Sequence, residues 1–459
     1  MRESDTIAAA ATAMSSSGIG IIRISGAEAF SIMKKIFRPY RKEKDMSAQP
    51  SYTVHYGTVE EGEEVLDEVL VLLMRGPHSY TAEDTVEIDC HGGRLVMQRI
   101  LDLVIKNGAR PAEPGEFTKR AFLNGRIDLS QAEAVMDLIQ SRNRMALKSS
   151  VSQLQGSVRQ QIEKLRSQIL YERAFLEAGL DAPEHISLDG YSEELLKKVE
   201  VICGEIEKLL KSSESGRILK EGIKTVILGK PNAGKSSLLN VLLGEERAIV
   251  TEIEGTTRDV LEEQLQLGDL SLLLLDTAGI RSTEDIVEQI GVDRARKQAE
   301  DADLILYVAD SSRPLNESDE EILSLLEGKK ALVLLNKSDL EPVVTPEIMR
   351  ERTKHKVLLI SAKEEQGIRE LEEEIRSLFF QGEVDFNDEI LITNARHKAA
   401  LQDARASLSM VKESIQNGMP EDFYTIDLTD AYQALGRILG EEMGEDLINE
   451  IFGKFCMGK

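Results

Sequence analysis

Residues 229–236 read Gly-Lys-Pro-Asn-Ala-Gly-Lys-Ser and combine flexible glycines with lysine and a hydroxyl. The glycines let the backbone fold tightly, so that several N–H groups can point at one phosphate, and Lys235 adds positive charge. The hydroxyl of Ser236 suits Mg²⁺ as a ligand. The segment follows the apolar run 225–228 and precedes a helical pattern, which is the context that a phosphate-binding loop requires. It therefore predicts a nucleotide site.

An acidic motif lies downstream of this loop. Residues 276–279 read Asp-Thr-Ala-Gly and follow the apolar run 272–275, which is typical of a buried strand. An acid at the end of such a strand orients the water shell of Mg²⁺, and Gly279 lets the backbone approach a γ-phosphate. Between the two motifs lies the segment 255–259, in which the hydroxyl of Thr257 is the natural second Mg²⁺ ligand.

The base is selected by the motif Asn-Lys-Ser-Asp at 336–339, which follows the apolar run 332–335. The carboxylate of Asp339 would accept hydrogen bonds from the ring N–H and the exocyclic amine of guanine. Adenine lacks this pair of donors and would leave the carboxylate unsatisfied, at a cost of about 1–3 kcal/mol. The motif Ser-Ala-Lys at 361–363 would support the guanine with backbone N–H groups. In this order, the motifs predict a Ras-like domain that binds and hydrolyses GTP.

Hydrolysis also needs a group that orients water. Ile280 occupies the position after Gly279 where Ras-like enzymes carry glutamine, and it cannot do this. The nearest acids are Glu284, Asp285 and Glu288, which are the candidates for positioning the attacking water.

The transition state needs positive charge, for which the sequence offers two sources. Arg258 could supply it, although its motif also fits a structural role in the switch segment. Alternatively, the side-chain oxygen of Asn232 could hold a potassium ion where an arginine finger otherwise reaches.

The chain of 459 residues is too long for one ordinary domain, and its aromatic fraction of 4% favours long helices over β-sandwiches. Its formal net charge of −25 repels phosphate backbones and anionic lipids, so a nucleic-acid substrate would need a local basic patch or a partner. The cysteines Cys90, Cys203 and Cys456 show no metal-ligand spacing. No apolar run reaches the roughly 18 residues that a membrane helix needs, so we expect a cytoplasmic protein.

The elements that position these motifs follow from hydrophobic periodicity. Strand patterns at 19–24, 65–74 and 86–89 and a helical stretch at 95–105 predict an N-terminal α+β segment. Ser130 and Glu133 form a capping-box pattern, and apolar residues from 154 to 169 share one predicted helix face. Strands and helices then alternate, as in a doubly wound α/β domain, before helical patterns return. The predicted domains are an N-terminal α+β domain at 1–122, half of a helical domain at 123–221, an inserted Ras-like G domain at 222–382, and the other helical half at 383–459.

Three further motifs make the chain recognisable. They are SYTAED at 79–84 with HGG at 91–93, PGEFTKRAFLNG at 114–125, and FCMGK at 455–459. With the nucleotide motifs, they resemble the TrmE/MnmE family of tRNA-modification GTPases from end to end. The resemblance implies an N-terminal folate-binding and dimerisation domain, a helical domain and an inserted G domain. It also implies a homodimeric, potassium-dependent GTPase that is activated when two G domains meet.

The resemblance extends to site residues. It implies that Glu288 is catalytic, that Ser236 and Thr257 bind Mg²⁺, and that potassium is bound by Asn232, Thr251, Ile253 and Thr256. The predicted nucleotide contacts are Asn232, Ala233, Gly234, Lys235, Ser236, Ser237, Thr251, Glu252, Ile253, Glu254, Gly255, Thr256, Thr257, Asp276, Thr277, Ala278, Gly279, Asn336, Lys337, Asp339, Ser361, Ala362 and Lys363.

By the same resemblance, formyl-tetrahydrofolate is bound by Arg23, Glu87, Arg126 and Lys459. Cationic groups suit the glutamate tail of a folate, and a carboxylate suits the donors of its pterin. Cys456 would lie near the folate, where it either takes part in one-carbon transfer or only packs the C-terminus.

Family members act with an FAD-dependent partner in a heterotetramer. Together they install a carboxymethylaminomethyl or aminomethyl group on C5 of the wobble uridine of certain tRNAs. Two alternatives stay open at this point. One is an Era-like regulatory GTPase in RNA or ribosome assembly without tRNA chemistry, and the other is a folate enzyme of small-molecule metabolism with a regulatory GTPase.

Overall fold

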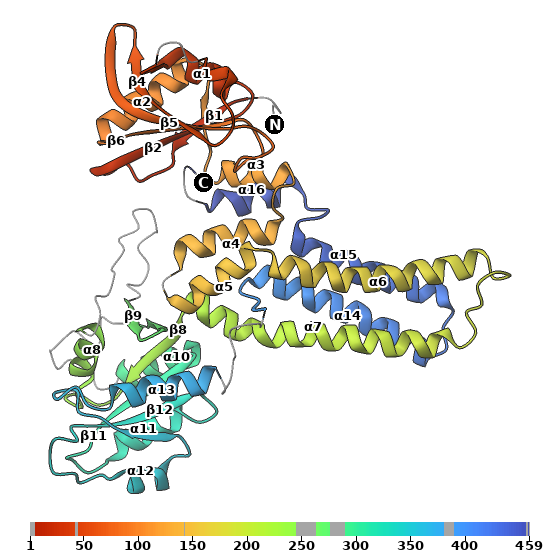
Figure 1. Ribbon diagram of the computed structural model, residues 1–459. Helices are drawn as coiled ribbons and strands as arrows, with labels where there is room; N and C mark the ends of the chain where they lie inside the picture. The colour runs from red at the N-terminus through yellow and green to blue at the C-terminus, as the bar shows by residue number, and fades with distance from the viewer. Residues whose placement is uncertain are drawn as a thin grey trace. The chain divides into compact units, whose positions relative to one another are not determined.

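The computed structural model describes residues 5–41, 45–141, 143–244, 263–275, 290–380, 390–455 and 458. The described chain divides into two compact units, and Figure 1 labels their elements. The first unit holds 1–136, 153–171 and 432–459, and the second holds 137–152 and 172–431.

An antiparallel sheet with one parallel edge pair forms the N-terminal part of the first unit. Among the described residues it has seven strands in the order β3-β4-β5-β6-β2-β1-β7. The strands are β1 (Ile7–Ala10), β2 (Ser17–Ser25), β3 (Phe37–Pro39), β4 (Thr53–Glu61), β5 (Glu64–Met74), β6 (Thr85–Gly92) and β7 (Arg110–Pro111). The accompanying helices are α1 (Ala29–Ile36), a 3-10 turn η1 (Met46–Ala48), α2 (Arg94–Lys106) and α3 (Glu116–Leu123).

The two faces of this sheet differ in their side chains. Alternate residues of each strand point to opposite faces, and the set that includes Val71 and Ile88 packs under α1 and α2. The opposite set includes Val54, Tyr56 and Leu70, which stay exposed. Since Tyr56 pairs with Leu70 across β4 and β5, these side chains form one open apolar face.

Helices that precede and follow the G domain in sequence form a helical region, whose residues belong partly to the first unit and partly to the second. They are α4 (Leu129–Gln140), α5 (Arg144–Leu154), α6 (Ser157–Asp181), α7 (Tyr191–Glu221), α14 (Ala395–Gln416), α15 (Glu421–Leu439) and α16 (Glu445–Gly453). Within the second unit, α7 and α14 pack side by side although the G domain separates them in sequence (Figure 1). No helix in the described part of the chain is both long and apolar enough to cross a bilayer.

The predicted capping box at Ser130 and Glu133 is wrong. The residues that form it are Asp128 and Gln131: Asp128 Oδ1 accepts from the N–H of Gln131 at 3.0 Å, and Gln131 Oε1 accepts from the N–H of Asp128 at 3.1 Å. Ser130 instead donates its hydroxyl to Asp128 at 2.6 Å. The sequence allows both registers, and burial of Leu129 places the helix start two residues earlier.

The single helix face predicted over 154–169 is also interrupted. Leu154 ends α5, and α6 begins at Ser157 after Gly156, whose φ is +94°. Such a φ stops a helix at little cost only for glycine. Hydrophobic periodicity runs across this break because both helices contribute to buried surface.

The G domain in the second unit is built on a second sheet. In the described residues it has six strands in the order β13-β12-β11-β8-β10-β9, which pair in parallel except for β9. Its strands are β8 (Ile223–Leu228), β9 (Glu263–Leu267), β10 (Leu270–Leu274), β11 (Leu304–Asp310), β12 (Ala331–Asn336) and β13 (Lys356–Leu359). Its helices are α8 (Lys235–Gly244), α10 (Ile290–Asp301), α11 (Glu317–Leu325), α12 (Pro346–Arg352) and α13 (Ile368–Phe379).

Helices cover both faces of this sheet. Leu306 and Leu334 share a core with α8 and α13, whereas the neighbouring Tyr307 and Val333 face α11 and α12 on the other side. Burial on both faces explains why β11 and β12 are apolar up to their last residues, Asp310 and Asn336, rather than alternating. The doubly wound G domain predicted from sequence is therefore present, and its carboxyl strand ends carry the nucleotide motifs.

Candidate nucleotide and folate sites

The P-loop joins β8 to α8. Gly229 has a φ of +151° and Gly234 a φ of +97°, which glycine adopts readily and other residues do not. A Cβ at Gly234 would lie 2.0 Å from Nδ2 of Asn336, so the loop packs directly on the guanine motif. Asn232 adopts a left-handed φ of +62°, which asparagine tolerates better than most residues. These conformations produce the tight turn that phosphate binding requires.

Asn336 ties the nucleotide motifs together. Its side chain is 2% exposed, donates to the carbonyl of Ala233 at 2.9 Å, and accepts from the N–H of Ala362 at 3.0 Å. The P-loop, the Asn-Lys-Ser-Asp motif and the Ser-Ala-Lys motif are thus joined through one amide. Sequence order alone predicted these motifs, and the fold brings them to one edge of the sheet.

The guanine carboxylate is oriented by a neighbour. Ser361 donates its hydroxyl to Asp339 Oδ1 at 2.7 Å, and this hydrogen bond lowers the pKa of that exposed carboxyl. Asp339 therefore keeps the charge with which it would accept from guanine. Lys337 has a φ of +64° and donates its ammonium to Asp310 Oδ2 at 2.6 Å.

Lys235 lies inside the curve of the P-loop. Its ammonium donates to the carbonyls of Gly229 at 2.6 Å and of Lys230 at 2.8 Å, and burial lowers its pKa. A phosphate oxygen can replace these carbonyls as the acceptor. Ser236 follows at the start of α8, the position at which the sequence predicts a ligand for the Mg²⁺ of a bound nucleotide.

Several predicted residues lie outside the described residues. They are Thr251, Glu252, Ile253, Glu254, Gly255, Thr256, Thr257, Arg258, Asp276, Thr277, Ala278, Gly279, Glu288, Cys456 and Lys459. The predictions for potassium, for the second Mg²⁺ ligand and for water positioning rest on them in whole or in part.

The predicted folate residues that are described lie together in the first unit. Arg23 on β2 pairs with Glu87 on β6, and its Nε donates to Glu87 Oε1 at 2.7 Å. The guanidinium of Arg23 also donates to the carbonyl of Gly458 at 3.2 Å, which brings the C-terminal motif to the sheet. Arg126 lies 4.8 Å from the ring centre of Tyr80, and Arg23 lies 5.4 Å from it.

Sequence reasoning assigned no role to Tyr80, Thr118 or Asp89. The hydroxyls of Tyr80 and Thr118 are 2.9 Å apart, which links two of the recognition motifs. Burial, with the charge of Glu87, raises the pKa of Asp89, and among the described residues its Oδ1 accepts no hydrogen bond. Asp89 lies two residues after Glu87 on the same strand, a period-2 position that the sequence displays.

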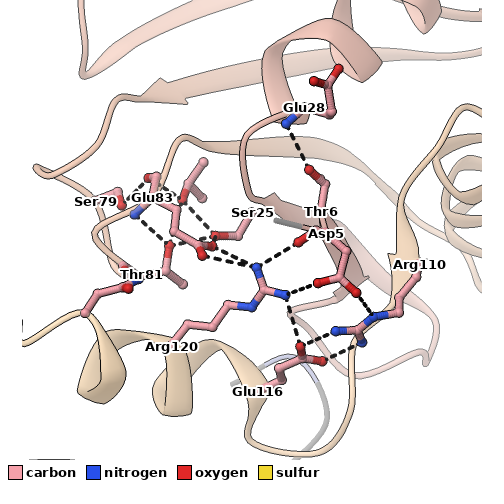
Figure 2. A network of polar contacts seen from close by, with 12 residues as sticks. Asp5, Thr6, Ser25, Glu28, Ser79, Thr81, Glu83, Arg110, Glu116 and Arg120 are labelled. Atoms are coloured by element: carbon pink, nitrogen blue, oxygen red, sulfur yellow. Dashed lines mark hydrogen bonds and ion pairs between the residues drawn. The ribbon is translucent and has the colours of Figure 1, made fainter. Parts of the chain in front are cut away.

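Figure 2 shows a charged network that joins Arg110 and Arg120 to Asp5, Glu83 and Glu116 in the first unit. Arg120 donates to Glu83 at 3.1 Å and to Asp5 Oδ1 at 3.2 Å, and Arg110 binds Glu116 through two hydrogen bonds of 2.6 and 2.8 Å. Glu116 is only 5% exposed. The network fixes the two motif segments on which Tyr80 and Thr118 lie.

Parallel strands with a P-loop after the first and an Asn-Lys-Ser-Asp motif after β12 define a guanine-nucleotide-binding protein. The family models of the MnmE helical domain and of the GTP-binding protein TrmE N-terminus match residues 129–456 and 6–126. The tRNA modification GTPase MnmE of Lachnoclostridium phytofermentans is 56% identical over 457 residues, which cover 100% of both chains. The protein of that name from Bacillus subtilis is 45% identical over 99% of this chain and 100% of its own.

Among solved structures, the G domain of the T. maritima FeoB iron transporter is 28% identical over 34% of this chain and 98% of its own, with a TM-score of 0.26. By its relatives and its family models, the chain belongs to the MnmE family of tRNA modification GTPases. It is a GTP-hydrolysing enzyme, and the family resemblance predicted from sequence is confirmed.

Proposed function

We propose that this GTPase modifies tRNA together with an FAD-dependent partner. The two would add a carboxymethylaminomethyl or aminomethyl group to C5 of the wobble uridine of certain tRNAs, with a one-carbon unit from formyl-tetrahydrofolate. The names of its full-length relatives support the tRNA substrate. We infer an N-terminal domain at 1–122, helical halves at 123–221 and 383–459, and a G domain at 222–382.

The observation that carries the folate part is the cluster of Arg23, Glu87 and Arg126 around Tyr80. The residues suit the ligand: guanidinium groups bind carboxylates, Tyr80 offers an aromatic face, and Glu87 accepts from N–H groups. Asp89 adds a buried carboxylate oxygen that accepts no hydrogen bond from any described residue. Lys459 follows Gly458, whose carbonyl Arg23 holds, and would complete the cluster.

The G domain would work with Mg²⁺ and K⁺. Ser236 would bind Mg²⁺ with Thr257, and Asn232 would hold K⁺ with Thr251, Ile253 and Thr256. The left-handed conformation of Asn232 supports a special role for its side chain. Potassium supplies positive charge to the transition state, and Glu288 orients the water.

The exposed apolar face of the N-terminal sheet and the net charge of the protein support proposals for its binding partners. The open apolar face with Val54, Tyr56 and Leu70 supports a homodimer formed by the N-terminal domains. The net charge of −25 supports a partner that holds much of the tRNA, as a heterotetramer with the FAD-dependent protein would allow. Cys456, close to Gly458, takes part in the chemistry or packs the C-terminus. The cytoplasmic location stays a prediction.

Calorimetric titration with formyl-tetrahydrofolate tests the folate site. Arg23→Met should weaken binding at least about tenfold, because it removes a charge-assisted contact and leaves Glu87 unpaired. Arg99→Met, which removes an exposed arginine on α2, is the matched control and should bind as the wild type does. Equal affinity of Arg23→Met and wild type would refute the site.

The tRNA chemistry is tested separately with tRNA from cells that lack this protein. Purified enzyme, the FAD-dependent partner, GTP, formyl-tetrahydrofolate, a reductant for the flavin and an amine donor (ammonium or an amino acid) should together produce the modified uridine, detected by mass spectrometry of nucleosides. Unchanged tRNA under these conditions would favour the Era-like regulatory GTPase.

A further inference from the structure

A second lysine of the P-loop points away from Lys235 and contacts helix α11. The ammonium of Lys230 donates to Asp319 Oδ2 at 2.5 Å and to Asn316 Oδ1 at 3.2 Å. Lys235 meanwhile holds the carbonyl of Lys230 at 2.8 Å. Lys230 is thus held at its backbone carbonyl by Lys235 and at its side chain by Asn316 and Asp319.

Asp319 is a buried acceptor for the Lys230 ammonium, and other hydrogen bonds fix its carboxylate. It is 1% exposed, and it also accepts from the hydroxyl of Tyr307 at 2.7 Å and from the N–H of Asn316 at 2.8 Å. Asn316 and Asp319 form the capping box of α11, so the carboxylate is fixed to the start of a helix. Tyr307 is fully buried on β11, which anchors the cluster in the core of the sheet.

The segment from Asp310 to Asp319 contacts both the P-loop and the guanine motif. Its first residue, 9% exposed, accepts from Lys337 of the guanine motif at 2.6 Å, and its last accepts from Lys230 of the P-loop. A cavity of about 220 Å³ lies between these contacts and is lined by Lys230, Asp310, Asn316 and Asp319 among others. Because the P-loop and the guanine motif both contact this short segment, the segment sets the distance between them.

We propose that Lys230 and Asp319 are positioning residues for GTP binding. Lys230 does not bind phosphate. It holds the P-loop against α11 and neutralises the buried Asp319 carboxylate beside the phosphate-binding site. Loss of either partner then has the same consequence. Without Lys230 the buried Asp319 carboxylate loses its positively charged partner, and without Asp319 the loop loses its contact with α11. This role concerns nucleotide binding alone and does not depend on the folate proposal.

The test compares Lys230→Met, Asp319→Asn and the double variant in the full-length protein. Affinities for a fluorescent GDP and a fluorescent, non-hydrolysable GTP analogue are measured by titration, and dissociation rates by stopped flow. Each single variant should bind both nucleotides about tenfold more weakly, since a hydrogen bond to a charged group is lost. The double variant should be no weaker than the weaker single variant, because both remove one contact.

A lysine that binds phosphate would give a different pattern. Lys230→Met would then weaken the triphosphate more than the diphosphate, while Asp319→Asn would free the lysine and leave affinity unchanged or higher. Either result overturns the proposal. Lys329→Met, which removes a lysine whose ammonium donates to the carbonyl of Glu300 at 2.9 Å, is the matched control and should leave both affinities unchanged.

A further readout separates positioning from general loss of structure. Lys230→Met should raise the KM for GTP with little change in kcat, because it alters binding and not the transition state. Lys230→Arg should restore most of the affinity, since a guanidinium can also reach Asp319. Failure of this conservative variant, or a fall in kcat with unchanged KM, contradicts the positioning role.

Discussion

Single side chains at the nucleotide site act through their neighbours. The Asp339 carboxylate is oriented by Ser361, which donates to one of its oxygens, and Asn336 holds two backbone segments at once. The amide of Asn336 has no room to move, because the loop at Gly234 lies against it. If Asp339 selects the base as the sequence predicts, base selection depends on one carboxylate held on a rigid support.

Substitution of this carboxylate should change the base. Asp339→Asn should lower GTP affinity by about a hundredfold or more, because an amide N–H₂ faces the donors of guanine. Xanthine nucleotides should bind better to the variant, since xanthine has a carbonyl where guanine has its amine. Competition titrations measure both effects. Asp269→Asn, on the exposed turn between β9 and β10, is the control, and unaltered GTP affinity of Asp339→Asn would exclude the assigned role.

At the scale of elements, the network of Figure 2 joins pieces that are distant in sequence. Arg120 on α3 binds Asp5, before β1, and Glu83, before β6. Arg120 is only 13% exposed and Glu116 6% in their side chains, so these charges are poorly solvated. Removal of Arg120 takes away the cationic partner of Glu83, whereas Arg110 still pairs with Asp5 and Glu116.

Arg120→Met should therefore lower the free energy of unfolding of the N-terminal part by about 1–3 kcal/mol, because its hydrogen bonds to charged groups are lost. Hydrogen exchange in β1 and α3 measures this locally. Arg159→Met removes an arginine from an exposed pair with Glu163 and should cost about 0–1 kcal/mol. A small effect for Arg120→Met would show that the network adds no net stability.

Acid should weaken the same elements. The hydrogen bond from Arg110 lowers the pKa of Asp5; burial opposes the lowering at Glu116, where hydrogen bonds from Arg110 and the N–H of Glu113 prevail. Carboxyls with lowered pKa stabilise the folded state above their unfolded values near about 4, and this contribution is lost as pH falls through the folded values. Protection from hydrogen exchange in β1 and α3 should fall between about pH 5 and 3, and Glu116→Gln should reduce that dependence.

For the whole molecule, the expectation concerns how G domains are activated. GTP turnover should be much faster in potassium than in sodium buffer at equal ionic strength, because a bound K⁺ would supply transition-state charge. Turnover per molecule should also rise with protein concentration if two G domains must meet. Equal rates in both ions would remove the role of Asn232 and direct attention to Arg258 or an external activator.

The sequence by itself determined the nucleotide chemistry and the family. The P-loop is contiguous, and its glycines, lysine and hydroxyl act through local backbone geometry. A short stretch of sequence is therefore enough to predict phosphate binding. The guanine motif follows a strand, and parallel strands present their carboxyl ends at one edge. The apolar runs 225–228 and 332–335 also predicted the buried strands β8 and β12 correctly.

Only the tertiary structure decided which distant side chains meet. Arg23 reaches the carbonyl of Gly458, 435 residues away, and Lys230 reaches Asp319 in another element. No periodicity encodes such pairs, because they depend on how sheets and helices pack after they form. The helix start at Leu129 and the break at Gly156 were likewise settled by burial and by a positive φ, which compete with equally good local patterns.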